Sequence, residues 1–149
     1  MSHVLSSDDL DRKYASNRLY GGCWPQDKVP PLDGHFVFVN LLLSTSPPDA
    51  VGHWLLCFDS KPDVCIYFDS MAERDAPVLL LRRMKETGKR ILTNDQMVQS
   101  FSQSDCGVLD AFVADELLAG RSFYDIIHRM LRDKRFSENQ RLALRETRF

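Results

Sequence analysis

The sequence has no long hydrophobic run and no excess of charge of one sign, and each absence excludes a class of protein. Among the 149 residues, the longest apolar stretch, Val37 to Leu43, is interrupted by Asn40 and is too short to cross a bilayer. Lys and Arg number 19 against 21 Asp and Glu, which gives a net charge of −2. No global positive field is available to hold nucleic acid without sequence preference. We therefore expect neither a membrane protein nor a DNA-dependent one.

A secretory signal and closely spaced cysteine pairs are also missing. The first residues, Met1-Ser2-His3-Val4, contain neither a basic nor an apolar region, so we expect an intracellular protein that is not secreted. In a reducing compartment the four cysteines should be free thiols rather than disulfides. No C-x-x-C pair of a zinc knuckle exists, and we expect no structural metal and no cofactor.

The remaining composition fits one globular domain. Hydrophobic residues make up 44% of the chain and charged residues 27%, as in ordinary soluble proteins. A chain of 149 residues is long enough to bury a core. No repeat, low-complexity tract or linker divides it, so we treat residues 1–149 as a single domain.

Turn-forming residues and apolar spacing divide the chain into helices and strands. Aromatic and β-branched residues predict five strands: Phe36 to Ser44, His53 to Phe58, Val64 to Phe68, Arg90 to Thr93 and Met97 to Gln99. Capping residues and helical spacing predict helices from Asp8 to about Asn17, Pro77 to Thr87 and Cys106 to Leu118, and two more after Ser122 and Ser137. Gly21 to Gly34 is predicted to be irregular. Without βαβ alternation, this order favours an α+β fold.

The second and third predicted strands form a hairpin that brings a histidine near a carboxylate. If the loop is centred on Lys61, His53 lies directly opposite Asp69, and Cys57 lies opposite Cys65. Opposed Cβ atoms are about 4.5–5.5 Å apart, which permits an imidazole–carboxylate hydrogen bond that would fix the histidine tautomer. The alternatives are a buried structural histidine, an aspartate that caps its strand, and a bulge that shifts the register by one. Cys57 and Cys65 are expected to be core residues.

Cys106 has the setting of a nucleophile. Polar residues precede it and an apolar helical pattern follows it, so the thiol should lie at a helix N-terminus, where the dipole and free amides favour thiolate. Gly107 would allow a substrate backbone to approach. Acyl transfer also needs donors for the developing oxyanion. The candidates are the Cys106 N–H and one of three glutamines, among which spacing does not choose: Gln96, Gln99 and Gln103.

Four segments in this order resemble the adenovirus-type and ubiquitin-like-protein-protease group of cysteine proteases: Gly52-His53-Trp54, Phe68-Asp69-Ser70, Gln99 and Asp105-Cys106-Gly107. The resemblance covers Asp33 to about Leu118. Two earlier segments are similar to the opening of viral members: Gly21-Gly22-Cys23-Trp24-Pro25 and Lys28-Val29-Pro30. The resemblance implies a papain-like cysteine protease core of the adenain type, with a small mixed sheet flanked by helices.

The resemblance also implies a role for each matching residue. His53 is then the general base, Asp69 orients it, and Cys106 attacks the scissile carbonyl. Gln99, seven residues before Cys106, matches the oxyanion glutamine of the adenovirus-type enzymes. The intervening stretch departs from the family pattern, so Gln103 stays an alternative. Substrate binding is assigned to Trp54, Gly52 and Gly107.

The expected function is a cysteine endopeptidase that cleaves after glycine-type sites, as in viral maturation proteases that cut capsid or core precursors in the host nucleus or virion. The alternatives are a protease that removes ubiquitin-like modifiers and an inactive binding module of the same fold. Adventitious zinc on the three triad groups is a further alternative. Adenovirus enzymes use DNA as a cofactor, which the slightly acidic composition here does not support. Activation by a peptide remains an alternative.

Overall fold

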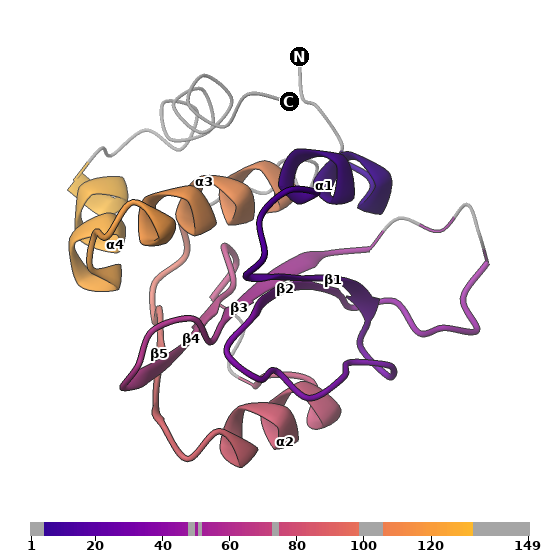
Figure 1. The fold of residues 1–149 in the computed structure, drawn as a ribbon. Helices are drawn as coiled ribbons and strands as arrows, with labels where there is room; N and C mark the ends of the chain where they lie inside the picture. The colour runs from indigo at the N-terminus through magenta and orange to yellow at the C-terminus, as the bar shows by residue number, and fades with distance from the viewer. Residues whose placement is uncertain (1–4, 48–49, 51, 73–74, 99–105, 133–149) are drawn as a thin grey trace.

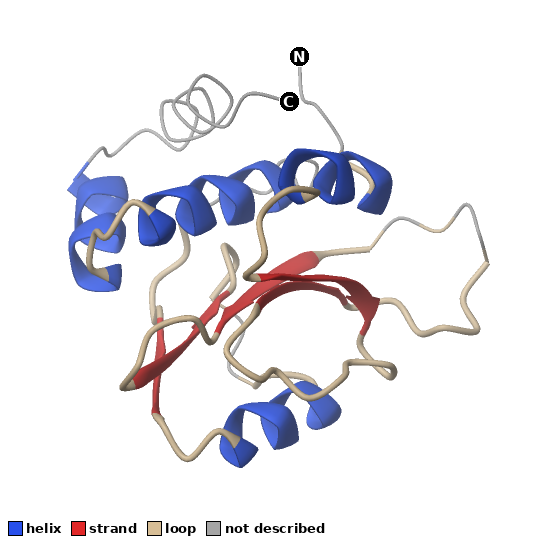
Figure 2. Ribbon diagram, viewed as in Figure 1, coloured by secondary structure: helices blue, strands red, loops and turns tan. Residues whose placement is uncertain are grey.

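The computed structural model describes residues 5–47, 50, 52–72, 75–98 and 106–132. These residues form a five-stranded mixed sheet and four helices (Figure 2). In chain order the elements are α1 Ser7–Tyr14, β1 Tyr20–Pro25, β2 Phe36–Asn40, β3 Trp54–Phe58, β4 Val64–Phe68, α2 Val78–Glu86, β5 Arg90–Thr93, α3 Cys106–Leu118 and α4 Phe123–Arg132.

The strands lie in the order β1-β2-β3-β4-β5. The central strands β2, β3 and β4 are antiparallel, whereas β1 is parallel to β2 and β5 is parallel to β4. Helices α1, α3 and α4 lie on one face of the sheet, and α2 lies on the other (Figure 1). The predicted small mixed sheet with flanking helices is therefore confirmed. The sequence pattern did not predict that β4, α2 and β5 form a βαβ unit, the connection that two parallel strands require.

Because helices cover both faces, the central strands are apolar at nearly every position. Alternate side chains point to opposite faces of a strand. Even-numbered residues join the core under α1, α3 and α4: Phe36, Phe38, Leu56, Phe58, Ile66 and Phe68. Odd-numbered residues join the core above α2: Val37, Val39, Leu55, Cys57, Cys65 and Tyr67.

Helix α3 has the predicted bounds, and it is buried almost all round. A helix that is apolar on every side requires neighbours on every side. It packs against β3 and α4, and Tyr14 of α1 contacts its Ala111 carbonyl oxygen at 3.1 Å. Its first residue, Cys106, is consequently held inside the protein at the end of the sheet.

Capping residues also mark the starts or ends of the other helices, although α1 ends at Tyr14 rather than near Asn17. Ser6 caps α1 in a capping box with Asp9. Gly88 follows α2 with φ +70°, the left-handed conformation expected after a helix. Ser122 Oγ accepts from the Asp125 N–H at the start of α4. The helix predicted after Ser137 lies outside the described residues.

The prediction for Gly21 to Gly34 was wrong in its first part, because β1 lies there. Two glycines weaken the strand pattern. Gly22, at φ +99°, lies within the irregular pairing of β1 with β2. At Gly21 a Cβ would lie only 2.8 Å from Val37 Cγ1, so the close approach of the two strands requires a glycine. Two predicted strands also differ: the strand from Phe36 ends at Asn40, and residues 97–98 are not in a strand.

The predicted hairpin register was wrong by two residues. Cys57 lies opposite Tyr67 rather than Cys65. Contacts of Asp59 accompany this shift: its N–H donates to His35 O, its carboxylate pairs with Lys89 at 2.9 Å, and it accepts from the Gly34 N–H. These contacts turn Asp59 away from β4.

A two-residue shift keeps the same side chains on the same face of the sheet, whereas a shift of one would reverse them. Cys57 and Cys65 therefore remain diagonal neighbours, with 3.9 Å between their sulfur atoms. Both are fully buried free thiols, as the core assignment predicted.

Candidate active site

His53 immediately precedes β3 and Asp69 immediately follows β4, so the antiparallel pairing of these strands brings both residues to one end of the sheet. His53 Nε2 lies 2.5 Å from Asp69 Oδ1. Both residues are buried, with exposed fractions of 6% and 1%. The predicted contact is confirmed, although the residues are diagonal rather than directly opposed. Diagonal neighbours remain within reach of a long side chain.

The backbone of Asp69 is held by Asn94, which follows β5. Asn94 Nδ2 donates to Asp69 O at 2.6 Å, and Asn94 Oδ1 accepts from the Asp69 N–H at 3.1 Å. The Met71 N–H also donates to Asp69 Oδ1. The sequence analysis did not identify Asn94. In the sequence, Asn94 is a polar residue directly after a predicted strand. Its contact with Asp69 could be recognised only once β5 was seen to pair with β4.

Cys106 is the first residue of α3, and its sulfur accepts a hydrogen bond from the Trp54 N–H at 3.3 Å. Burial, together with the charge of Asp110, raises the pKa of the Cys106 thiol to about 12. Hydrogen bonds from the N–H groups of Trp54, Gly107 and Cys106 act in the opposite direction. The N-terminal position on the helix was predicted to favour thiolate, but burial outweighs it. The thiol of Cys106 is consequently protonated near neutral pH.

His53 has one ring nitrogen available for that proton. Nε2 is engaged by Asp69, whereas the buried Nδ1 has no hydrogen-bond partner among the described residues. Because the carboxylate accepts from Nε2, the neutral ring carries its proton there and Nδ1 is the basic atom. The next residue, Trp54, donates its N–H to the sulfur of Cys106, so the imidazole and the thiol both adjoin Trp54.

Asp110 is a second buried acid at this site. It lies one helical turn after Cys106 on α3, it is fully buried, and neither carboxyl oxygen has a hydrogen-bond partner among the described residues. Burial and the nearby charge of Asp69 raise the pKa of Asp110 well above its usual range. The sequence analysis missed it, although an acid within an apolar helical pattern was a visible signal.

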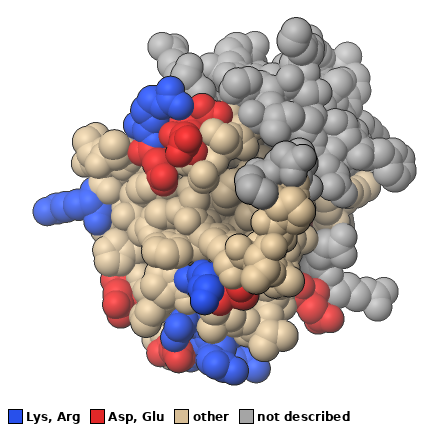
Figure 3. Space-filling view, turned by 90° about the vertical axis from the view of Figure 1, so that its right-hand side faces the viewer, with Lys and Arg blue, Asp and Glu red and all other residues tan. Residues whose placement is uncertain are grey.

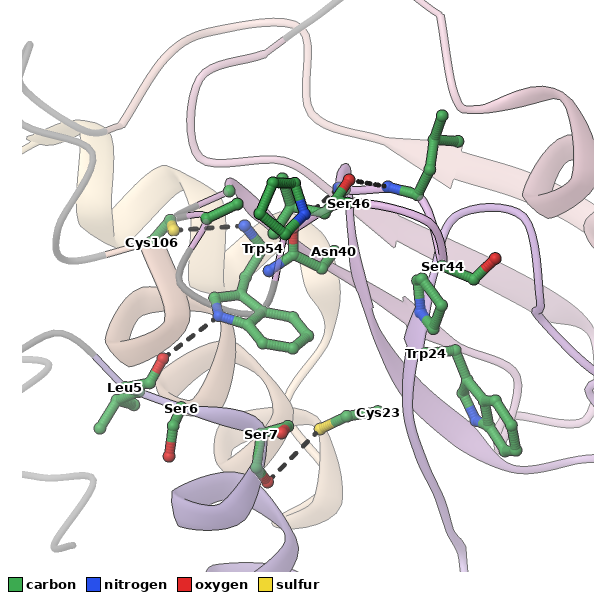
Figure 4. A pocket seen from close by; sticks show the side chains of 16 residues that line it. Leu5, Ser6, Ser7, Cys23, Trp24, Asn40, Ser44, Ser46, Trp54 and Cys106 are labelled. Atoms are coloured by element: carbon green, nitrogen blue, oxygen red, sulfur yellow. Dashed lines mark hydrogen bonds between the residues drawn. The ribbon is translucent and has the colours of Figure 1, made fainter.

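A cleft of about 500 Å³ opens beside Cys106. Figure 4 shows Trp54, Asn40 and Trp24 along it, with Cys106 at one end. Its described lining carries no charged side chain: Leu5, Ser6, Ser7, Cys23, Trp24, Pro25, Asn40, Leu42, Leu43, Ser44, Ser46, Pro47, Ala50, Gly52, Trp54 and Cys106. The described surface on this side of the molecule is mainly uncharged in its centre, with charges around it (Figure 3). The cleft therefore suits an uncharged chain segment.

The predicted substrate-binding residues occupy different places. Trp54 and Gly52 line the cleft. A Cβ on Gly52 would lie 2.1 Å from Asn40 Oδ1, so a glycine is needed for the walls to approach. Gly107 is buried, and its role in substrate binding stays a prediction. Cys23 lines the same cleft as Cys106.

The oxyanion glutamine was assigned to Gln99, with Gln103 as the alternative, and both lie outside the described residues. Gln96 is exposed, and its main-chain oxygen accepts a hydrogen bond from Asn94 Nδ2 at 3.2 Å. Among the three glutamines, only the position of Gln96 is therefore described.

Three further features were sought: a metal site, a membrane-spanning helix and similarity to known proteins. No group of three or more His, Cys, Asp or Glu side chains within the described ranges could hold a metal ion. None of the described helices is long and apolar enough to span a membrane. No protein-family model matches the sequence, and no curated protein matches it.

We predict that Asn94→Ala lowers the free energy of unfolding by about 1–3 kcal/mol, because it leaves the buried N–H and C=O of Asp69 without their partner. Denaturant unfolding measures this loss. Thr93→Ala is the control, since Thr93 is the exposed neighbour of Asn94. Equal stability of the two variants would contradict the role given to Asn94.

We predict that Asp110→Asn gains stability relative to the wild type as pH rises above about 4. The pKa of Asp110 is higher in the folded protein than in the unfolded chain, so the wild type loses stability as the unfolded chain ionises. The difference should widen by about 1.4 kcal/mol per pH unit until folded Asp110 ionises. Unfolding curves at several pH values measure it, with exposed Asp63→Asn as the control. A constant difference would show that folded Asp110 is already ionised.

Proposed function

We propose that the protein is a cysteine endopeptidase with a papain-like core of the adenain type. Cys106 is the nucleophile, His53 the general base and Asp69 its orienting carboxylate. One observation carries the proposal. The buried 2.5 Å contact between His53 and Asp69 adjoins Trp54, whose N–H holds the Cys106 sulfur at the end of an uncharged cleft.

The reaction begins with a protonated thiol. His53 Nδ1 takes the proton from Cys106, and the sulfur attacks the scissile carbonyl carbon. Asp69 stabilises the resulting imidazolium through Nε2. His53 then gives the proton to the leaving amine as the C–N bond breaks. A water molecule, deprotonated by His53, hydrolyses the thioester and returns the thiol.

The tetrahedral intermediate carries a negative oxygen that needs hydrogen-bond donors. The Cys106 N–H, at the free N-terminus of α3, is one donor. A glutamine side chain is the second, and we assign it to Gln99 by the resemblance of its spacing. The raised pKa of Asp110 favours its protonated form, which supports this chemistry because an ionised Asp110 would repel the thiolate.

Protein segments are the proposed substrates, with glycine beside the scissile bond. The uncharged lining and the close approach of Gly52 to Asn40 support small, uncharged residues near Cys106. The further proposal, that the substrates are viral capsid or core precursors, rests on the resemblance of the sequence motifs alone. A panel of capsid-precursor and ubiquitin-like substrates separates the two protease classes.

We predict that a peptide vinyl sulfone ending in glycine labels the wild type at Cys106. Labelling should be lost in Cys106→Ala and fall at least about tenfold in His53→Ala, because the protonated thiol needs its base. Mass spectrometry of digested protein locates the label, and circular dichroism checks the fold. Cys23→Ala is the matched control, since Cys23 lines the same cleft. Labelling at Cys23, or full labelling of His53→Ala, would contradict the proposed roles.

We predict that one of three alanine variants, Gln99→Ala, lowers kcat by about 10²–10³ for a glycine-containing peptide, because it removes one oxyanion donor. Gln96→Ala and Gln103→Ala should change kcat little. Peptide cleavage measured at saturating substrate gives the comparison. A large loss at Gln103 with normal activity of Gln99→Ala would move the donor to Gln103.

A further inference from the structure

Trp54 connects two parts of the chain that are far apart in sequence. Its backbone N–H donates to the Cys106 sulfur at 3.3 Å, and its ring Nε1–H donates to the main-chain oxygen of Leu5 at 3.3 Å. Figure 4 shows the indole between these two contacts, at the edge of the cleft. The residue that holds the thiol is therefore itself attached to the segment before α1.

The side chain of Leu5 reinforces this attachment. Leu5 is only 3% exposed. A Cβ on Gly107 would lie 3.2 Å from Leu5 Cβ and 3.4 Å from Trp54 Cδ1. Leu5 and Trp54 thus both lie over the first turn of α3, and a Cβ at position 107 would be in tight contact with Leu5.

The position of Leu5 is fixed from the other side by α1. The next residue, Ser6, exchanges two hydrogen bonds with Asp9, at 3.0 and 3.2 Å. Helix α1 is joined to α3 by the ion pair of Lys13 with Asp115 at 3.0 Å. The Leu5 carbonyl is consequently attached, through Ser6 and α1, to α3, the helix on which Cys106 lies.

We propose that Leu5 is a positioning residue for the nucleophile, which fixes the Trp54 ring and thereby the N–H group that holds the Cys106 sulfur. The role in catalysis rests on the proposed protease function, but the effect on the thiol does not. Loss of Leu5 should let Trp54 move and weaken the hydrogen bond to the sulfur. A hydrogen bond to the charged form of an acid favours that form, so the thiolate becomes harder to produce.

The test is the rate at which iodoacetamide alkylates Cys106 between pH 6 and 10. The background is Cys23→Ala, because Cys23 lines the same cleft. We expect Leu5→Ala to slow alkylation about tenfold at pH 7, as a rise of one unit in the thiol pKa would produce. Leu5→Ile should restore most of the rate. Leu10→Ala is the matched control: Leu10 is a fully buried leucine of α1 that does not line the cleft, so its loss should lower Tm and leave alkylation unchanged.

Trp54→Phe provides a second variant if Leu5→Ala does not fold. It removes the ring donor to Leu5 O and keeps an aromatic ring, so it should also slow alkylation. The double variant should be little slower than the slower single one, because both changes act through one contact. Faster alkylation of Leu5→Ala would mean that Leu5 only covers the thiol. Unchanged alkylation would mean that Leu5 neither covers the thiol nor positions the Trp54 N–H. Either result overturns the inference.

These outcomes are independent of the proposed protease activity. If the wild type cleaves no peptide but alkylation is slower in Leu5→Ala, the proposed function is wrong and the positioning role of Leu5 stands. A wild type that cleaves peptides, with alkylation unaffected by Leu5, loses the positioning role alone.

Discussion

The hydrogen bond between His53 and Asp69 depends on the pairing of β3 with β4, and the site depends on that bond. Both residues flank these strands and are buried. Burial of an unpaired carboxylate would be energetically costly. The bond occupies His53 Nε2 and leaves Nδ1 as the basic nitrogen. Asn94, which follows the neighbouring strand β5, holds the backbone N–H and C=O of Asp69. The sheet thus determines which atom of the imidazole is available for chemistry.

Burial shapes the rest of the site, and it opposes the ionisation of the thiol. Apolar neighbours surround helix α3 and hold Cys106 beside Trp54, and the same burial raises the pKa of the thiol to about 12. The N–H groups at the helix start and the N–H of Trp54 compensate in part. Burial also raises the pKa of Asp110 on the same helix, and the charge of Asp110 opposes ionisation of the sulfur. In the proposed mechanism, the proton therefore moves to His53 as the substrate is attacked.

The sequence predicted those features that depend on local pattern. The change from polar to apolar residues at Cys106 located the start of α3, and the alternation of turn formers with apolar runs located β3 and β4. Strand β1 was not predicted because two glycines weaken its strand pattern. The hairpin register was wrong by two residues, and the shift is accompanied by contacts of Asp59 with Lys89 and Gly34, which are distant in sequence. Asn94, Asp110 and Leu5 gained roles only through packing between elements, which a single sequence does not display. The error of two residues left His53 on the correct face, so the predicted contact survived the wrong register.

In the proposed mechanism, Asp69 acts on the thiol of Cys106 through His53. The pH dependence of Cys106 alkylation in the wild type and in Asp69→Asn, both in the Cys23→Ala background, tests this role. Asparagine retains the size of the side chain and removes the charge that stabilises the imidazolium and fixes the tautomer. The account predicts that the alkylation profile of Asp69→Asn moves to higher pH. Superimposable profiles from two correctly folded proteins would contradict it, because His53 and Asp69 would then be a structural pair with no influence on the thiol.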